Sequence, residues 1–119
     1  GPTFMANPLA CAVANASLDL FEQEPRLEQV AAIEDQLRRE LAPCRAIPGV
    51  RDVRVMGAIG VVELDKIEDA DALRRAFVDR GTWVRPFRRI VYLTPAFTIT
   101  TEELSTLTGA IVDILKARA

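Results

Sequence analysis

The fold is decided by the stretch Gly81-Thr82-Trp83-Val84-Arg85-Pro86-Phe87, followed by Arg88-Arg89-Ile90-Val91-Tyr92-Leu93-Thr94-Pro95. This pattern predicts a strand, a short turn and a second strand. Because side chains alternate along a strand, Trp83, Arg85 and Phe87 should share one face while Val84 points to the other. A guanidinium beside an indole on a sheet face indicates either a structural ion pair or an anion-binding site.

Two further strands and a short helix precede this stretch. Residues 50–56 alternate between apolar and polar, as a half-buried strand does, and residues 58–64 form a more apolar strand after a turn at Gly57. Gly60 inside that strand indicates a bulge or a close approach of another part of the chain. Asp69 is a typical N-cap for a short helix that Gly81 ends.

Three longer helices complete the chain. Asn7-Pro8 is a strong helix start, and the small residues of the helix that follows predict packing on both of its sides. This helix could equally lie outside the sandwich and pack on a partner outside this sequence. A second helix is expected over residues 26–42, with an apolar stripe that begins at Leu27 and ends at Leu41. Thr100 and Glu103 form a capping box for the last helix.

The element order is therefore α-α-β-β-α-β-β-α. Segregated helices and hairpin-linked strands predict an α+β fold. We expect a small, mostly antiparallel sheet of about four strands with helices on one face, preceded by a long helix.

Composition limits the function classes. The chain has 119 residues, a net charge of −2 and an apolar fraction of 50%. This balance is typical of a soluble globular domain and argues against nucleic-acid and membrane partners. No histidine is present, so histidine-based triads and histidine-ligated zinc are excluded, and no metal site is expected. The two cysteines, Cys11 and Cys44, lack metal-like or redox spacing and predict a reduced, cytoplasmic protein.

Arg85 is the best candidate for a functional residue. Arginine presents a rigid fork that binds carboxylate or phosphate through two parallel hydrogen bonds. The carboxylates at strand ends and helix starts are better explained as solvated groups and caps. From the residues alone, a structural ion pair and a ligand-binding role for Arg85 both stay open.

Three separated motifs resemble those of the class III, pyridoxal-phosphate-dependent aminotransferases. They are Gly-Pro-Thr-Phe-Met-Ala-Asn-Pro-Leu-Ala-Cys-Ala at residues 1–12, Arg-Val-Met-Gly-Ala-Ile-Gly-Val-Val-Glu at residues 54–63 and Trp-Val-Arg-Pro-Phe at residues 83–87. The resemblance runs to the last helix. The second and third motifs narrow it to the biotin-biosynthetic branch of the family, which moves an amino group from S-adenosylmethionine to 8-amino-7-oxononanoate.

The resemblance implies a role for particular residues. Pro2 and Thr3 match the segment that reaches the cofactor phosphate of the neighbouring subunit. Arg85 matches the arginine that binds the carboxylate of the keto substrate, and Tyr92 matches a tyrosine that lines the substrate pocket. From the residues alone, Tyr92 could equally be a core residue of the hairpin.

The resemblance also implies an organisation. The whole chain, residues 1–119, would be the C-terminal small domain of such an enzyme, with residues 1–23 as an interface segment and connecting helix and residues 24–119 as the α+β sandwich. Its partners would be its own large domain and a second subunit of a homodimer. The large domain would carry the Schiff-base lysine, since Lys66 and Lys116 lie outside the motif for it. The chain alone should then bind no pyridoxal 5'-phosphate and be inactive.

Two other interpretations remain open. One is another class III aminotransferase, such as one acting on an ω-amino acid. The other is a free-standing α+β module for binding or dimerisation, in which Arg85 holds a small anion.

Overall fold

The computed structural model describes residues 3–119, and side-chain surroundings from residue 5 onward. The elements, in chain order, are the 3₁₀ helix η1 (Thr3–Ala6), α1 (Pro8–Gln23), α2 (Arg26–Leu41), the 3₁₀ helix η2 (Ala42–Ala46), β1 (Val50–Met56), β2 (Ile59–Leu64), α3 (Ala70–Asp79), β3 (Ile90–Leu93) and α4 (Thr101–Arg118). The fold is α+β, as predicted. None of the described helices is long and apolar enough to cross a membrane.

The sheet has three antiparallel strands in the order β1-β2-β3, rather than the four predicted. The missing strand is the one expected at residues 81–87, which lies outside the ladder and reaches it only through a bridge between Phe87 and Ile90. Proline at position 86 has no N–H to donate to a ladder, which helps to explain the difference. The alternation of faces was nevertheless correct. Thr82 and Val84 are buried, and Trp83, Arg85 and Phe87 are exposed.

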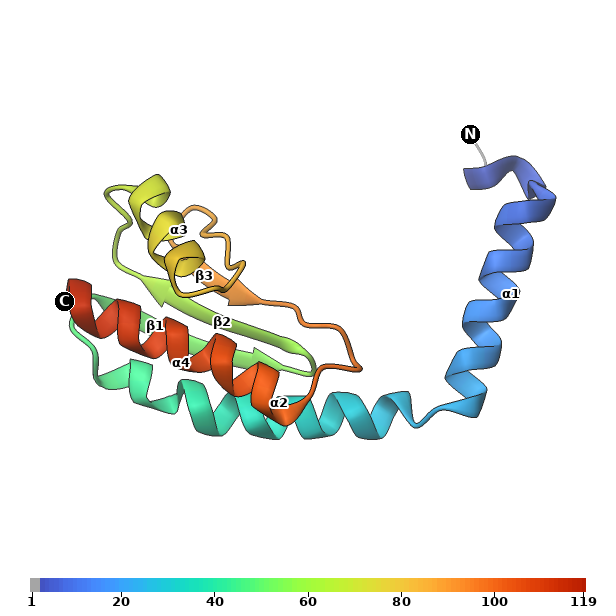
Figure 1. Cartoon of the computed structure of the whole chain (residues 1–119), viewed down its shortest axis with the longest axis horizontal. Coiled ribbons are helices and arrows are strands. Elements are labelled where there is room, and N and C mark those ends of the chain that lie inside the picture. Colours follow the sequence, from blue (N-terminus) through green and yellow to red (C-terminus); the bar gives the residue numbers. More distant parts are fainter. Residues whose placement is uncertain (1–2) are drawn as a thin grey trace.

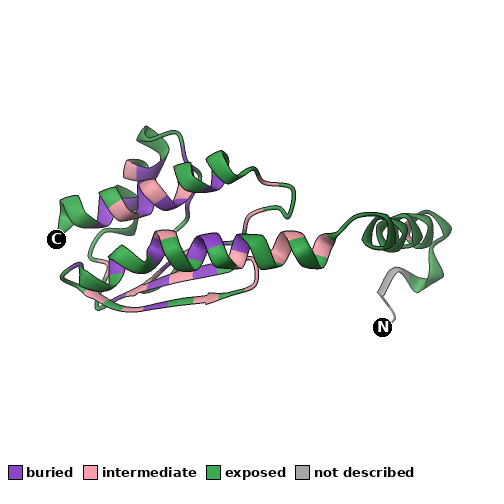
Figure 2. Ribbon diagram, turned by 90° about the horizontal axis from the view of Figure 1, so that it is seen from below, coloured by how far each residue is buried: buried purple, intermediate pink, exposed green. Residues whose placement is uncertain are grey.

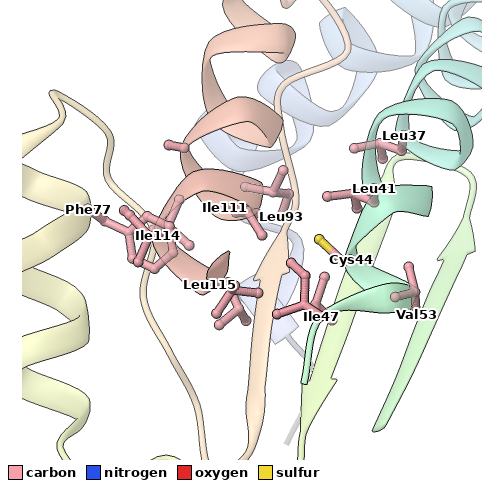
Figure 3. Close-up of a cluster of buried hydrophobic side chains, with 14 of the residues drawn as sticks. Leu37, Leu41, Cys44, Ile47, Val53, Phe77, Leu93, Ile111, Ile114 and Leu115 are labelled. Carbon is pink, nitrogen blue, oxygen red and sulfur yellow. The ribbon is translucent and has the colours of Figure 1, made fainter. Parts of the chain in front are cut away.

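Helices cover one face of the sheet (Figures 1 and 2). Helix α2 packs against β1 and β2, α4 packs against α2, and α3 packs beside α4. The inward side chains of the strands join those of the helices in one continuous core (Figure 3). Its largest fully buried side chain is Phe77 of α3. The other fully buried aliphatic residues of the core include Leu37, Leu41, Val62, Val91, Leu104, Ile111 and Leu115.

Gly60 allows α2 to lie close to the sheet. A Cβ at this position would lie 3.0 Å from Leu41 Cδ1 and 3.4 Å from both methyl groups of Leu37. The close approach predicted from the glycine is therefore correct, and the bulge is not at this position. The irregularity in register falls between Val50 and Asp52 instead.

Helix α1 projects away from the rest of the fold (Figure 1). None of its residues is buried, and Figure 2 shows it exposed along almost its whole length. The radius of gyration is 17.2 Å, against roughly 13–14 Å expected for a compact domain of this size. Of the two alternatives for this helix, the structure shows the one in which it lies outside the sandwich, and no packing on both of its sides is found within the described chain. The predicted start of the α2 stripe is wrong, because Leu27 is 84% exposed where α2 extends beyond the sheet.

The helix caps follow the sequence closely. The Asn7 side chain accepts a hydrogen bond from the Ala10 N–H at 3.0 Å. The Asp69 side chain caps α3 in the same way. Thr100 and Glu103 form the reciprocal capping box of α4. These short side chains satisfy backbone N–H groups that have no partner inside a helix, which is why they fix where each helix begins.

Candidate functional site

Residues 81–87, the segment that carries Arg85, are anchored by the side chains that they bury. The Thr82 hydroxyl donates to the Phe77 carbonyl at 2.8 Å, and the Thr82 N–H donates to the same oxygen at 3.0 Å. Val84 is 2% exposed and packs in the core. These two anchors leave Trp83 and Arg85 on the opposite side of the segment, where both are exposed.

A tight turn follows the segment. Phe87 and Ile90 exchange both backbone hydrogen bonds at 2.9 Å, so Arg88 and Arg89 are the two central residues of a hairpin turn. This turn brings the chain back into β3 and thereby fixes where Tyr92 lies relative to Arg85.

Tyr92 lies on β3 opposite Val61 of β2. Its neighbours Val91 and Leu93 are buried beneath the helices, so Tyr92 points to the other face of the sheet and is half-buried. The tyrosine is therefore not a fully buried core residue, and its ring forms part of a cleft.

Arg85 and Tyr92 line one cleft of about 300 Å³. The remaining lining residues come from the Arg85 segment, the end of β3 and α4, and they are Trp83, Leu93, Thr94, Pro95 and Leu107. The family resemblance implied that Arg85 and Tyr92 serve the same substrate, but nothing in the sequence indicated that Leu107 of α4 would line the cleft with them. The cleft thus combines one guanidinium and one phenol with apolar walls.

The charge of Arg85 has no carboxylate partner within ion-pair distance among residues 5–119. Glu63, the carboxylate bound to this turn, is 2.7 Å from Arg54 and 3.5 Å from Arg89. The hydrogen bond from Arg54 is the main cause that holds the pKa of Glu63 below its usual 4.5. Glu63 is therefore ionised at neutral pH and already paired, which leaves the Arg85 guanidinium available to an external anion.

Neither lysine lies in this cleft. Lys66 Nζ is 2.5 Å from the Glu68 carboxylate, and this hydrogen bond raises the pKa of Lys66 above its usual 10.5. Lys116 lies at the exposed end of α4. The cleft that Arg85 lines therefore contains no amine that could form a Schiff base. The described residues do not complete a site for pyridoxal 5'-phosphate.

The candidate cofactor residues lie at the start of the chain. Pro2 lies outside the described residues. Thr3 begins η1, but its side chain also lies outside the described part. Their predicted contact with a cofactor phosphate stays a prediction.

A larger hollow of about 610 Å³ lies between α3 and α4. Its charged groups are mixed, with Glu68, Asp69 and Asp79 beside Arg80 and Arg118, and some of them already have structural partners. Asp69 caps α3, and Arg80 is paired with Asp113 at 2.8 Å. Its walls include small alanines of α3 and α4. The Arg85 cleft is the better candidate, because its lining contains one guanidinium and no carboxylate, whereas three carboxylates and two guanidinium groups line the hollow.

Comparisons with known proteins agree on one family. Residues 1–115 match the aminotransferase class-III family. The adenosylmethionine-8-amino-7-oxononanoate aminotransferase of Corynebacterium glutamicum is 43% identical over 118 residues, which cover 99% of this chain and 28% of that protein. The enzyme of the same name from Mycobacterium leprae is 44% identical over 114 residues, which cover 96% of this chain and 26% of that protein.

Solved structures show the same fold. The adenosylmethionine-8-amino-7-oxononanoate aminotransferase of Methanocaldococcus jannaschii superposes with a TM-score of 0.83 at 25% identity, over 98% of this chain and 29% of that one. An (S)-enantioselective omega-transaminase of Thermomicrobium roseum superposes with a TM-score of 0.87 at 29% identity, over 99% of this chain and 29% of that one. The chain thus spans between a quarter and a third of the length of these relatives. It belongs to the class III aminotransferase family.

Proposed function

We propose that this chain is the C-terminal small domain of a transaminase that moves an amino group from S-adenosylmethionine to 8-amino-7-oxononanoate. The names of the relatives from Corynebacterium glutamicum and Mycobacterium leprae support the reaction. The observation that carries the role of this domain is the exposed, unpaired Arg85 in one cleft with Tyr92.

Arg85 binds the carboxylate of the keto substrate in this proposal. A guanidinium can hold a carboxylate through two parallel hydrogen bonds, and a charge-assisted bond of this kind contributes roughly 1.5–3 kcal/mol. Trp83 and Leu107 supply apolar surface for the aliphatic chain of the substrate, and the Tyr92 hydroxyl offers a further hydrogen bond. This chain thereby fixes one end of the substrate and orients the other.

The cofactor would come with the rest of the enzyme. Pyridoxal 5'-phosphate supplies the electron sink for amino-group transfer when it is bound. Because the described chain provides no suitable lysine, the Schiff-base lysine would belong to the large domain. Pro2 and Thr3 would contact the cofactor phosphate of the second subunit. The 119-residue chain alone is then inactive.

The exposure of helix α1 supports the proposed contacts with a large domain and a second subunit. Its apolar side chains are open to solvent, with Leu9 76% exposed and Val13 and Leu18 each 62% exposed. A contiguous exposed apolar surface usually marks an interface. We place residues 1–23 against the large domain and the second subunit, and residues 24–119 in the small-domain sandwich. This exposed helix also argues against a free-standing module, which would present the same surface to water.

The test uses the full-length enzyme. Purified protein is supplied with 8-amino-7-oxononanoate and either S-adenosylmethionine or an ω-amino acid as the amino donor, and the diamine product is measured. We expect product with S-adenosylmethionine. Transfer from the ω-amino acid alone would instead support the second candidate, which the similarity to the Thermomicrobium roseum omega-transaminase favours. No transfer from either donor would contradict the proposed function.

A further inference from the structure

Arg88 occupies a backbone position that favours glycine. Its φ angle is +53°, in the left-handed region that a residue with a Cβ rarely adopts. Arg88 is the first central residue of the two-residue turn between Phe87 and Ile90. In turns of this kind with a positive φ only at the first central position, glycine is the usual residue there. The arginine is therefore kept in place at a cost in backbone free energy.

The Arg88 guanidinium is not neutralised by the described chain. Arg89, its neighbour in the turn, is 3.5 Å from the Glu63 carboxylate. Arg88 has no carboxylate within ion-pair distance among residues 5–119. Its Cζ atom lies 5.3 Å from the centroid of the Phe87 ring instead. A ring face attracts a cation without cancelling its charge, so Phe87 holds this charge at the turn.

Phe87, whose ring lies against the Arg88 guanidinium, lies on the same side of the segment as Arg85. Arg85 and Phe87 are both exposed, whereas Val84 between Trp83 and Arg85 is buried. Two unneutralised guanidinium groups therefore lie within four consecutive residues, and the first of them, Arg85, lines the cleft. A strained backbone that keeps a charge three residues from a site residue points to a functional use for that charge.

We infer that Arg88 is a second cation for the carboxylate substrate that Arg85 binds, and that Phe87 positions it. The inference rests on the proposed function. Arg85 makes the direct contact, and Arg88 adds a longer-range attraction that favours ligands with a carboxylate over neutral ketones and amines. Such an attraction acts on substrate binding and leaves the chemical step unchanged.

The test compares full-length enzyme carrying Arg88→Ala, Arg88→Gly or Arg88→Lys with the wild type. Arg88→Gly suits the backbone conformation, so its effect cannot be assigned to a damaged turn. Arg75→Ala removes an equally exposed charge from α3 and is the matched control. The readouts are kcat and KM for 8-amino-7-oxononanoate at several ionic strengths, and KM for the corresponding amino ketone without the carboxylate.

We expect Arg88→Ala and Arg88→Gly to raise the KM of the keto acid about two- to five-fold at low salt, the range of a partly exposed ion pair. Their kcat, and the KM of the uncharged analogue, should stay within two-fold of the wild type. Arg88→Lys and Arg75→Ala should behave like the wild type. The rise in KM with ionic strength should be smaller in Arg88→Ala, because one charge fewer is screened.

Two results would overturn the inference, and they differ. In the first, the wild type converts the keto acid, but Arg88→Ala and Arg88→Gly have the wild-type KM at low salt. This result contradicts the role of Arg88 and leaves the proposed function intact. In the second, the wild type does not convert the keto acid, which contradicts both the role of Arg88 and the proposed function.

Discussion

Glu40 joins helices α2 and α4 through a small polar cluster. Its carboxylate accepts hydrogen bonds from Gln36 Nε2 at 2.9 Å, Ser105 Oγ at 2.6 Å and Thr108 Oγ1 at 2.7 Å. Gln36 and Thr108 are buried, at 6% and 1% exposed. We predict that Glu40→Ala loosens this contact and lowers the free energy of unfolding of the 119-residue chain.

The expected loss follows from what each donor does without Glu40. Gln36 keeps its bond to the Thr101 carbonyl at 2.8 Å, and the exposed Ser105 hydroxyl can donate to water. The Thr108 hydroxyl can still donate to the carbonyls of Leu104 and Ser105 in its own helix, both at the longer distance of 3.2 Å. A hydrogen bond to a charged group contributes about 1.5–3 kcal/mol. Because all three donors keep or find another acceptor, we expect a net loss of about 1–2 kcal/mol at pH 7.

The same cluster predicts a pH dependence. Burial acts to raise the pKa of Glu40, but the hydrogen bonds from Ser105, Thr108 and Gln36 outweigh it and hold the pKa below 4.5. A carboxylate with a lowered pKa in the folded state stabilises the fold above its ordinary pKa. This stabilisation is lost as the pH falls through the folded-state value. The difference between the wild type and Glu40→Ala should therefore be full at pH 7 and shrink below about pH 4.5.

Urea denaturation followed by circular dichroism measures both effects. Asp35→Ala removes an exposed carboxylate from the same helix and should change the free energy of unfolding by less than about 0.5 kcal/mol. If Glu40→Ala is no less stable than Asp35→Ala at pH 7, or if its difference from the wild type does not shrink in acid, the reasoning about this cluster is wrong.

Three further predictions concern the core. Gly60→Ala places a methyl group 3.0 Å from Leu41 Cδ1 and should lower the free energy of unfolding by about 1–2 kcal/mol; an unchanged urea midpoint would contradict this. Phe77→Ala empties the largest fully buried site and should cost about 3–5 kcal/mol, so a smaller loss would show that the site collapses. Burial raises the pKa of Cys44 to about 11, so about one thiol in a thousand is ionised at pH 8. A thiol reagent should therefore modify exposed Cys11 first and Cys44 only on unfolding, and equal rates would refute this.

Much of the secondary structure could be predicted because local chemistry determines it. Asn7, Asp69 and Thr100 each satisfy orphan N–H groups at a helix start, and such caps depend only on residues a few positions away. The prediction of a strand at residues 81–87 was wrong because strand pairing depends on residues far away in the sequence. Its alternation correctly predicted which side chains are buried, but alternation does not reveal whether a neighbouring strand is available for pairing.

The site could be predicted only in part. Arg85 and Tyr92 were expected to share a pocket, and the structure places them in one cleft. Leu107 also lines this cleft, but no local sequence pattern predicts this, since the position of Leu107 depends on how α4 packs over the sheet. The positive φ of Arg88 had no signal in the sequence, since nothing in an arginine predicts it. The Glu40 cluster was missed because two of its partners, Ser105 and Thr108, lie more than 60 residues away in sequence.

The most direct test of the proposed role of this domain is the KM of full-length enzyme for 8-amino-7-oxononanoate after Arg85→Ala, with S-adenosylmethionine as donor. Loss of a bidentate bond worth roughly 1.5–3 kcal/mol corresponds to a rise in KM of about ten- to one-hundred-fold. Bound cofactor, measured by its absorbance, should stay at the wild-type level, and Arg85→Lys should fall between the two because it keeps the charge without the fork. An unchanged KM in Arg85→Ala would contradict the role of Arg85 as the substrate carboxylate site.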